Sequence, residues 1–88
     1  MKTMENEQRK LFRKMTAAYN RKIQDAPDVA RALELYKDCQ LLFSFVSLLW
    51  PNEPLDLQRG NIKVSLEMVL DKELKNIDSE RVLYTELL

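Results

Sequence analysis

The residues of this 88-residue chain with the clearest potential for chemistry are two pairs of carboxylates. Glu34 and Asp38 lie four positions apart, and so do Glu67 and Asp71. On a helix this spacing places both members of a pair on one face. Two such pairs on facing helices would offer Mg²⁺ or Mn²⁺ the oxygen ligands of a metal-dependent phosphohydrolase. Both pairs fall on the polar side of their helical patterns, however, so we expect them to face solvent.

Other catalytic groups are scarce. The chain has no histidine, which is the commonest general base, and Cys39 is its only cysteine. Zinc sites need several Cys or His ligands. Cys39 has no histidine to activate it, so we expect a buried, unreactive thiol. One glycine excludes a glycine-rich phosphate loop. We therefore expect a protein that is not an enzyme, with no catalytic residue, cofactor or metal.

Charge is unevenly distributed although the net charge is zero. Residues 1–24 hold seven cationic and two acidic residues, a net charge of +5 that residues 25–88 balance. An acidic protein surface or the phosphates of a nucleic acid would match this basic face, and the plain alternative is a solvated polar face. The near-neutral pI and the lack of interleaved aromatic residues count against nucleic acid. The candidate binding residues are Arg9, Lys10, Arg13, Lys14, Arg21 and Lys22.

The segment from 39 to 50 is apolar around most of a helix. Its polar positions, extended back one turn, are Lys37, Gln40, Ser44 and Ser47, whose spacing traces one narrow stripe. Such a helix is either the centre of a core or a surface completed by a second copy or a partner helix. Two or three neighbouring helices are too few to cover every side chain, which favours a homo-oligomer. The candidate self-association residues are Leu42, Phe43, Phe45, Val46, Leu49 and Trp50.

These segments need long helices to position them. Gly60 is the only glycine and Pro27, Pro51 and Pro54 the only prolines, so few residues interrupt the helical periodicity. We expect one all-α domain over 1–88, a small antiparallel bundle of three long helices plus a short C-terminal helix. The expected helices cover about 3–24, 27–50, 61–77 and 79–88, with a connector over 51–60.

Local signals suggest where these helices begin and end. Thr3, Asp25 and Asn61 are suitable N-caps for the first three helices. Gly60 is suited to the position just after a helical turn, where a left-handed backbone is common. Asp78 or Ser79 would cap the short fourth helix.

Composition also suggests a compartment and a class of function. The chain shows no signal peptide and no apolar run of about 20 residues, so we expect a cytoplasmic protein that does not enter a membrane. We expect a small binding or regulatory module, such as an inhibitor, adaptor or accessory subunit. Immunity proteins, antitoxins and phage regulators are comparable only at the level of fold. The alternative is a nucleic-acid-binding accessory factor that uses the basic N-terminal helix.

Overall fold

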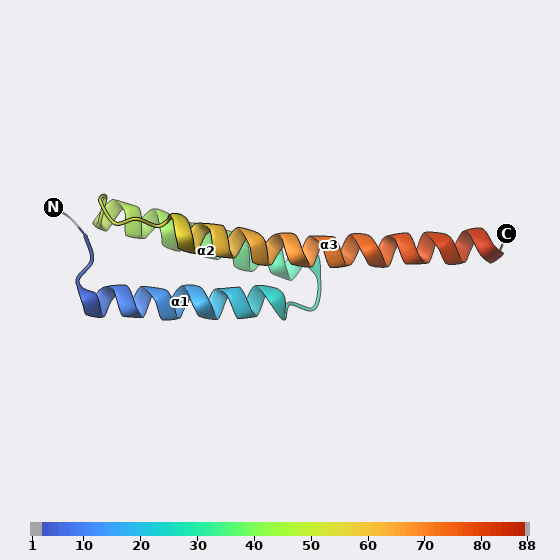
Figure 1. Cartoon of the computed structure of the whole chain (residues 1–88), viewed down its shortest axis with the longest axis horizontal. Helices are drawn as coiled ribbons and strands as arrows, with labels where there is room; N and C mark the ends of the chain where they lie inside the picture. The colour runs from blue at the N-terminus through green and yellow to red at the C-terminus, as the bar shows by residue number, and fades with distance from the viewer. Residues whose placement is uncertain (1–2, 88) are drawn as a thin grey trace.

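The computed structural model describes the backbone of residues 3–87 and the side chains of residues 3–77. Within that range the chain forms three helices and no strand: α1 (Asn6–Gln24), α2 (Val29–Leu49) and α3 (Asp56–Leu87). They run up, down and up, so that α2 is antiparallel to both others (Figure 1). The expected all-α bundle is confirmed. The molecule is a rod of 65 × 17 × 17 Å, because α3 extends well past the other two helices (Figure 1).

The first helix begins later than the sequence suggested. Glu5, not Thr3, is the N-cap of α1, and its backbone N–H donates to Oε1 of Gln8 at 2.9 Å. This bond pairs one of the backbone donors that a helix start leaves free. Thr3 lies outside the helix, so the expectation of a Thr3 cap was wrong.

The second helix also begins later than expected. Asp28 is its N-cap, and Oδ1 of Asp28 accepts a hydrogen bond from the backbone N–H of Arg31 at 2.8 Å. Asp25, the expected cap, instead follows α1, and its own N–H donates to the carbonyl of Arg21 at 2.9 Å. Pro27 separates the two aspartates and disfavours helical backbone in the residue before it. The cap is therefore the aspartate after the proline.

The largest departure from the expected boundaries is in α3. It is continuous from Asp56 to Leu87, so the connector to 60, the helix start at Asn61 and the separate helix over 79–88 were all wrong. Gly60 lies inside the helix with no positive φ. Glycine in a helix costs about 1 kcal/mol relative to alanine, which the burial of Ile62 and Leu66 outweighs. The side chains of 78–88, including the expected cap, lie outside the described residues.

One core runs along the facing sides of the three helices. The largest completely enclosed side chains are Ile23, Cys39, Phe43 and Ile62. The rings of Phe12 and Phe43 meet edge to face, with centroids 5.9 Å apart. The remaining buried apolar side chains are Met4, Ala32, Leu35, Val46, Leu55 and Leu66.

A polar cluster fixes the axial position of α3 relative to α1. The Ser65 hydroxyl is buried, donates to Oδ1 of Asn20 at 2.8 Å and accepts from Nε2 of Gln24 at 3.0 Å. Ser65 therefore lies beside the last turn of α1. Beyond that level, all side chains from Asp71 to Ile77 are exposed, since neither α1 nor α2 reaches them.

Candidate interaction surfaces

The paired carboxylates do not form a metal site. Glu34, Asp38, Glu67 and Asp71 are all exposed. Glu34 accepts a hydrogen bond from the guanidinium of Arg31 at 3.0 Å on the same helix. Among the residues that the structure describes, no group of three or more His, Cys, Asp or Glu side chains lies close enough to hold a metal ion. The geometry therefore provides no support for metal-assisted hydrolysis.

Cys39 lies in the centre of the core. Its side chain is fully buried between the helices, and burial raises the pKa of the thiol to about 11. A thiol reacts as the thiolate, which apolar surroundings disfavour. Cys39 is thus placed as a packing residue.

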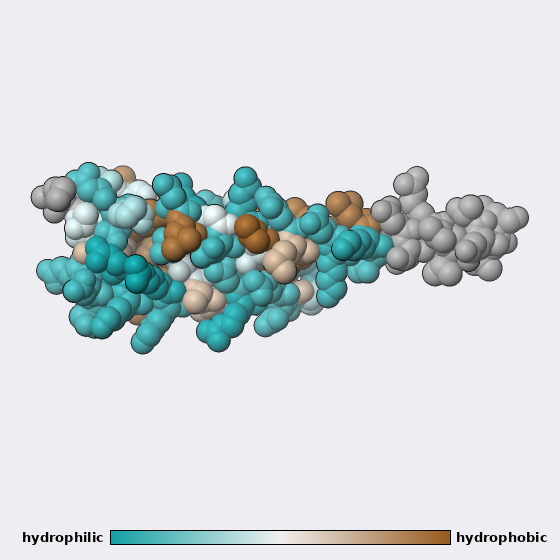
Figure 2. Space-filling view, viewed as in Figure 1, coloured by the Kyte–Doolittle hydropathy of each residue, from teal (hydrophilic) through white to brown (hydrophobic). Residues whose placement is uncertain are grey.

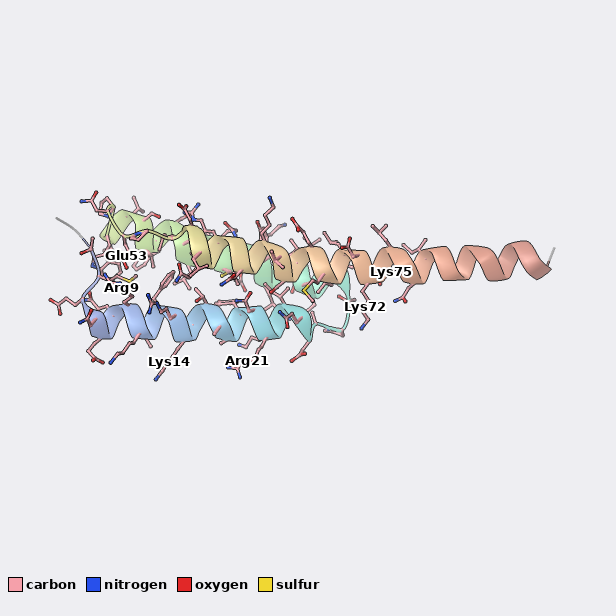
Figure 3. The ribbon with its side chains drawn as sticks, viewed as in Figure 1. Arg9, Lys14, Arg21, Glu53, Lys72 and Lys75 are labelled. Carbon is pink, nitrogen blue, oxygen red and sulfur yellow. The ribbon has the colours of Figure 1, made fainter. Side chains whose placement is uncertain are left out.

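Arg9 differs from the other residues of the predicted basic face, because it turns inward. Its Nε lies 2.6 Å from Oε1 of Glu53 in the connector between α2 and α3, and its Nη2 donates to Oε2 of the same carboxylate at 3.0 Å (Figure 3). Nη2 also donates to the carbonyl of Met4 at 3.0 Å. Arg9 therefore holds parts of the fold together, and its charge is already paired with that of Glu53.

The other five basic residues of α1 are all exposed. Lys14 and Arg21 point away from the bundle (Figure 3). Lys10 has one acidic neighbour, Glu7, at 3.6 Å, and both side chains are largely in water. Exposed pairs of this kind contribute little to stability. These residues present their charge to solvent rather than to the core.

The predicted self-association residues separate into three groups. Phe43 and Val46 belong to the core, so neither is available to a partner. Leu42 and Trp50 are half-buried against that core. Phe45 and Leu49 are exposed, by 60% and 46% respectively.

Four exposed apolar residues next to this surface were not predicted as contacts. Leu41 and Leu48 are 70% and 81% exposed on α2, and Leu11 and Met15 are exposed on α1. Leu41, Phe45 and Leu48, spaced by 4 and 3 residues, lie opposite the core side of α2, but in a segment that is apolar on nearly every side this spacing alone does not distinguish the outer face from the inner one. We call the combined surface the apolar face, made of Leu11, Met15, Leu41, Phe45, Leu48 and Leu49.

A shallow groove of about 240 Å³ lies in this face between α1 and α2. Its lining is almost entirely apolar, and Leu11, Met15 and Phe45 stand around it, with Leu42 and Trp50 among the other lining residues. On the side of the molecule seen in Figure 2, the surface over α1 is mostly hydrophilic, and a few apolar side chains lie among hydrophilic ones along α3. Single exposed apolar residues are ordinary, whereas a contiguous group marks a contact surface.

Comparison of the chain with protein families, curated proteins and solved structures found no match. In the described part of the chain, no helix is both long enough and apolar enough to cross a membrane. What the chain does must therefore be argued from its surfaces.

Proposed function

We propose that the protein is a non-enzymatic binding module that pairs with a second copy of itself through the apolar face. The observation that carries this proposal is the exposure of Leu41, Phe45 and Leu48, by 60–81%, on the side of α2 that faces away from its own core. Leaving three large apolar side chains in water is unfavourable, and covering each fully stabilises by roughly 1.5–3 kcal/mol.

The spacing of these residues suits a helical partner. Alternating steps of 4 and 3 residues form the seam along which two helices interlock side chains. The groove beside Phe45 has space for an aromatic side chain, and Phe45 stands at its edge. In a two-fold pair the same patch serves both copies, so Phe45 of each copy would enter the groove of the other.

The size of the surface supports a reversible dimer. Six exposed apolar side chains supply several hundred Å², and a standard interface needs about 800 Å² from each partner, including a polar rim. The apolar face therefore provides the centre of such an interface. Aromatic residues near the centre carry most of the binding energy, which identifies Phe45 as the side chain to test. Inhibitors, adaptors and accessory subunits commonly act through surfaces of this kind.

Sedimentation velocity over the micromolar range tests the proposal. Wild-type protein should form a dimer, and Phe45→Asp should be monomeric with unchanged helicity, because Phe45 is not part of the core. Met68→Asp is the matched control, since Met68 is 57% exposed and lines a hollow between α1 and α3 rather than the groove of the apolar face. It should dimerise like wild type. Self-association through this face would be refuted if the wild type were a monomer at every concentration, or if Phe45→Asp and Met68→Asp lost the dimer equally.

A further inference from the structure

The exposed cations of α1 continue onto α3. Besides Lys14 and Arg21, Figure 3 labels Lys72 and Lys75 on the part of α3 that extends past the bundle, and the Lys72 side chain points to the same side of the rod as those of Lys14 and Arg21. Because α1 and α3 run in parallel, the second pair follows the first along the long axis (Figure 1). We call this line, together with Arg13 and Lys22 on its two flanks, the basic ridge; its members are Lys10, Arg13, Lys14, Arg21, Lys22, Lys72 and Lys75.

The length of the ridge follows from helix geometry. At 1.5 Å per residue, Lys10 and Lys22 are about 18 Å apart along α1. Gln24 reaches Ser65, which places Ser65 beside the end of α1. Lys75 lies about 15 Å further along α3 by the same rise per residue. The ridge therefore spans about 33 Å, close to one turn of a nucleic acid duplex.

Most of the charge on this ridge is available to a ligand. Of its seven cations, Lys10 is the one with an ion-pair partner among the described residues, and that contact is long and exposed. Arg21 and Lys22 also line an open hollow of about 480 Å³ at the turn between α1 and α2. Arg31 also lines the hollow, with its charge paired to Glu34, and Asp25 supplies one carboxylate. The hollow thus provides a place beside the ridge where positive charge exceeds negative.

The chemistry of the ridge matches phosphate better than a protein surface. Protein partners are held mainly by apolar and aromatic anchors at the centre of an interface. On α1 the exposed apolar side chains Leu11 and Met15 lie instead around the groove on the α2 side. A duplex presents one negative charge per about 1.7 Å of its axis and can be bound by cations alone. Binding of single strands relies on stacking against aromatic side chains, and no residue of the ridge is aromatic.

We infer that the basic ridge binds the phosphate backbone of a double-stranded nucleic acid without reading its sequence. The neutral net charge of the chain is compatible with this, because residues 1–24 carry a net charge of +5 that the remaining residues balance. This inference does not rest on the proposed dimer, since the ridge and the apolar face share no residue.

Fluorescence anisotropy with a labelled random-sequence duplex of about two helical turns, each ~34 Å, tests the ridge. Affinity should fall steeply with salt, with a log–log slope approaching about −6 if all seven cations contact phosphates. Two double variants divide the ridge: Lys14→Gln with Arg21→Gln, and Lys72→Gln with Lys75→Gln. Each should weaken binding at least about tenfold at low salt and reduce the slope by about 2.

The matched control is Lys37→Gln with Lys63→Gln. It also removes two exposed cations, but from α2 and α3 at positions off the ridge. It should bind within about twofold of wild type, because scattered charges add little to a backbone contact. Circular dichroism of all three double variants should match wild type, since every substituted side chain is exposed.

Several outcomes would overturn the inference. One is failure of the wild type to bind the duplex at low salt, and another is a loss of affinity in the control variant as large as in the two ridge variants. Loss of affinity in the Lys14/Arg21 variant alone would show that the ridge ends with α1. Tighter binding to a single strand of the same length would reject the duplex. Displacement of the duplex by polyglutamate at equal charge would instead indicate an acidic protein partner. None of these results bears on dimerisation, which sedimentation measures separately.

Discussion

Arg9 and Glu53 are 44 residues apart in sequence, yet the Arg9 Nε and the Glu53 Oε1 lie 2.6 Å apart. The Glu53 side chain is 4% exposed, and its second oxygen accepts from the backbone N–H of Met4 at 3.1 Å. One carboxylate thus ties the start of α1 and the segment before it to the connector between α2 and α3. The hydrogen bond from Arg9 lowers the pKa of Glu53, and the same bond raises the pKa of Arg9.

The first prediction concerns this ion pair and pH. Because the pKa of Glu53 is lower in the folded than in the unfolded chain, the stabilisation is complete above about pH 4.3, the ordinary pKa of glutamate. It is lost as the pH falls through the lowered folded value. At neutral pH, Glu53→Gln should reduce the melting temperature by roughly 5–10 °C. The difference from wild type should shrink in acid, measured by thermal melts across the pH range.

Glu34→Gln is the control for that prediction. The guanidinium of Arg31 lies 3.0 Å from the Glu34 carboxylate, but both side chains are more than half exposed. Exposed ion pairs contribute little, so the melting temperature should change by less than about 2 °C. If both variants melt alike at every pH, the Arg9–Glu53 pair has no special role in stability.

The second prediction is that Gly60→Ala stabilises the protein. Gly60 lies within α3 at a negative φ, and a Cβ added there would meet no atom within 4 Å. Alanine should therefore raise the free energy of unfolding by about 0.5–1 kcal/mol, measured by urea titration. Had Gly60 ended a helical turn in a left-handed conformation, the same substitution would destabilise. The sign of the change distinguishes the two structures.

The third prediction compares two phenylalanines on α2. Phe43→Ala should cost about 3–5 kcal/mol, since the ring is fully enclosed and packs on Phe12. Phe45→Ala removes the same atoms from a side chain that is 60% exposed, and it should cost less than about 1 kcal/mol in the monomer. Urea unfolding at low protein concentration measures both, so that association does not contribute. Equal costs would contradict the placement of these two rings.

The fourth prediction concerns the reactivity of Cys39. With its side chain enclosed and its pKa raised to about 11, the thiol should react with an aromatic disulfide reagent about a hundredfold more slowly in the native than in the unfolded protein at mildly alkaline pH. The rate then reports the opening of α2 from the bundle. Rapid labelling of the native protein, with its helical signal unchanged, would contradict this burial.

The sequence by itself determined the all-α fold class and the approximate positions of the two ends of α2, which lie close to prolines. Pro27 and Pro51 bracket α2 to within two residues, because proline restricts the backbone of its immediate neighbourhood regardless of the rest of the fold. Ile62 and Leu66 are four residues apart, so a helix places them on one face, and both are buried.

Other local sequence signals led to wrong predictions at positions where contacts between residues distant in sequence decide the structure. Gly60 and Asn61 have the composition of a helix boundary, but the burial of Ile62 beside them outweighs a local preference of about 1 kcal/mol. Arg9 matches the other cations of α1 in type and spacing. Its pairing depends on Glu53, which only the packing of the connector brings near.

The candidate surfaces show the same division. Phe43 and Phe45 lie in a segment that is apolar on nearly every side, where periodicity does not distinguish the inner face from the outer one. The positions of α1 and α3 around α2 enclose Phe43 and leave Phe45 in water. Likewise, Lys72 follows the cations of α1 on the same side of the rod only because the two helices are parallel and α3 is the longer (Figure 3). Local sequence specifies which segments are helical, whereas the arrangement of whole helices decides which side of each is a surface.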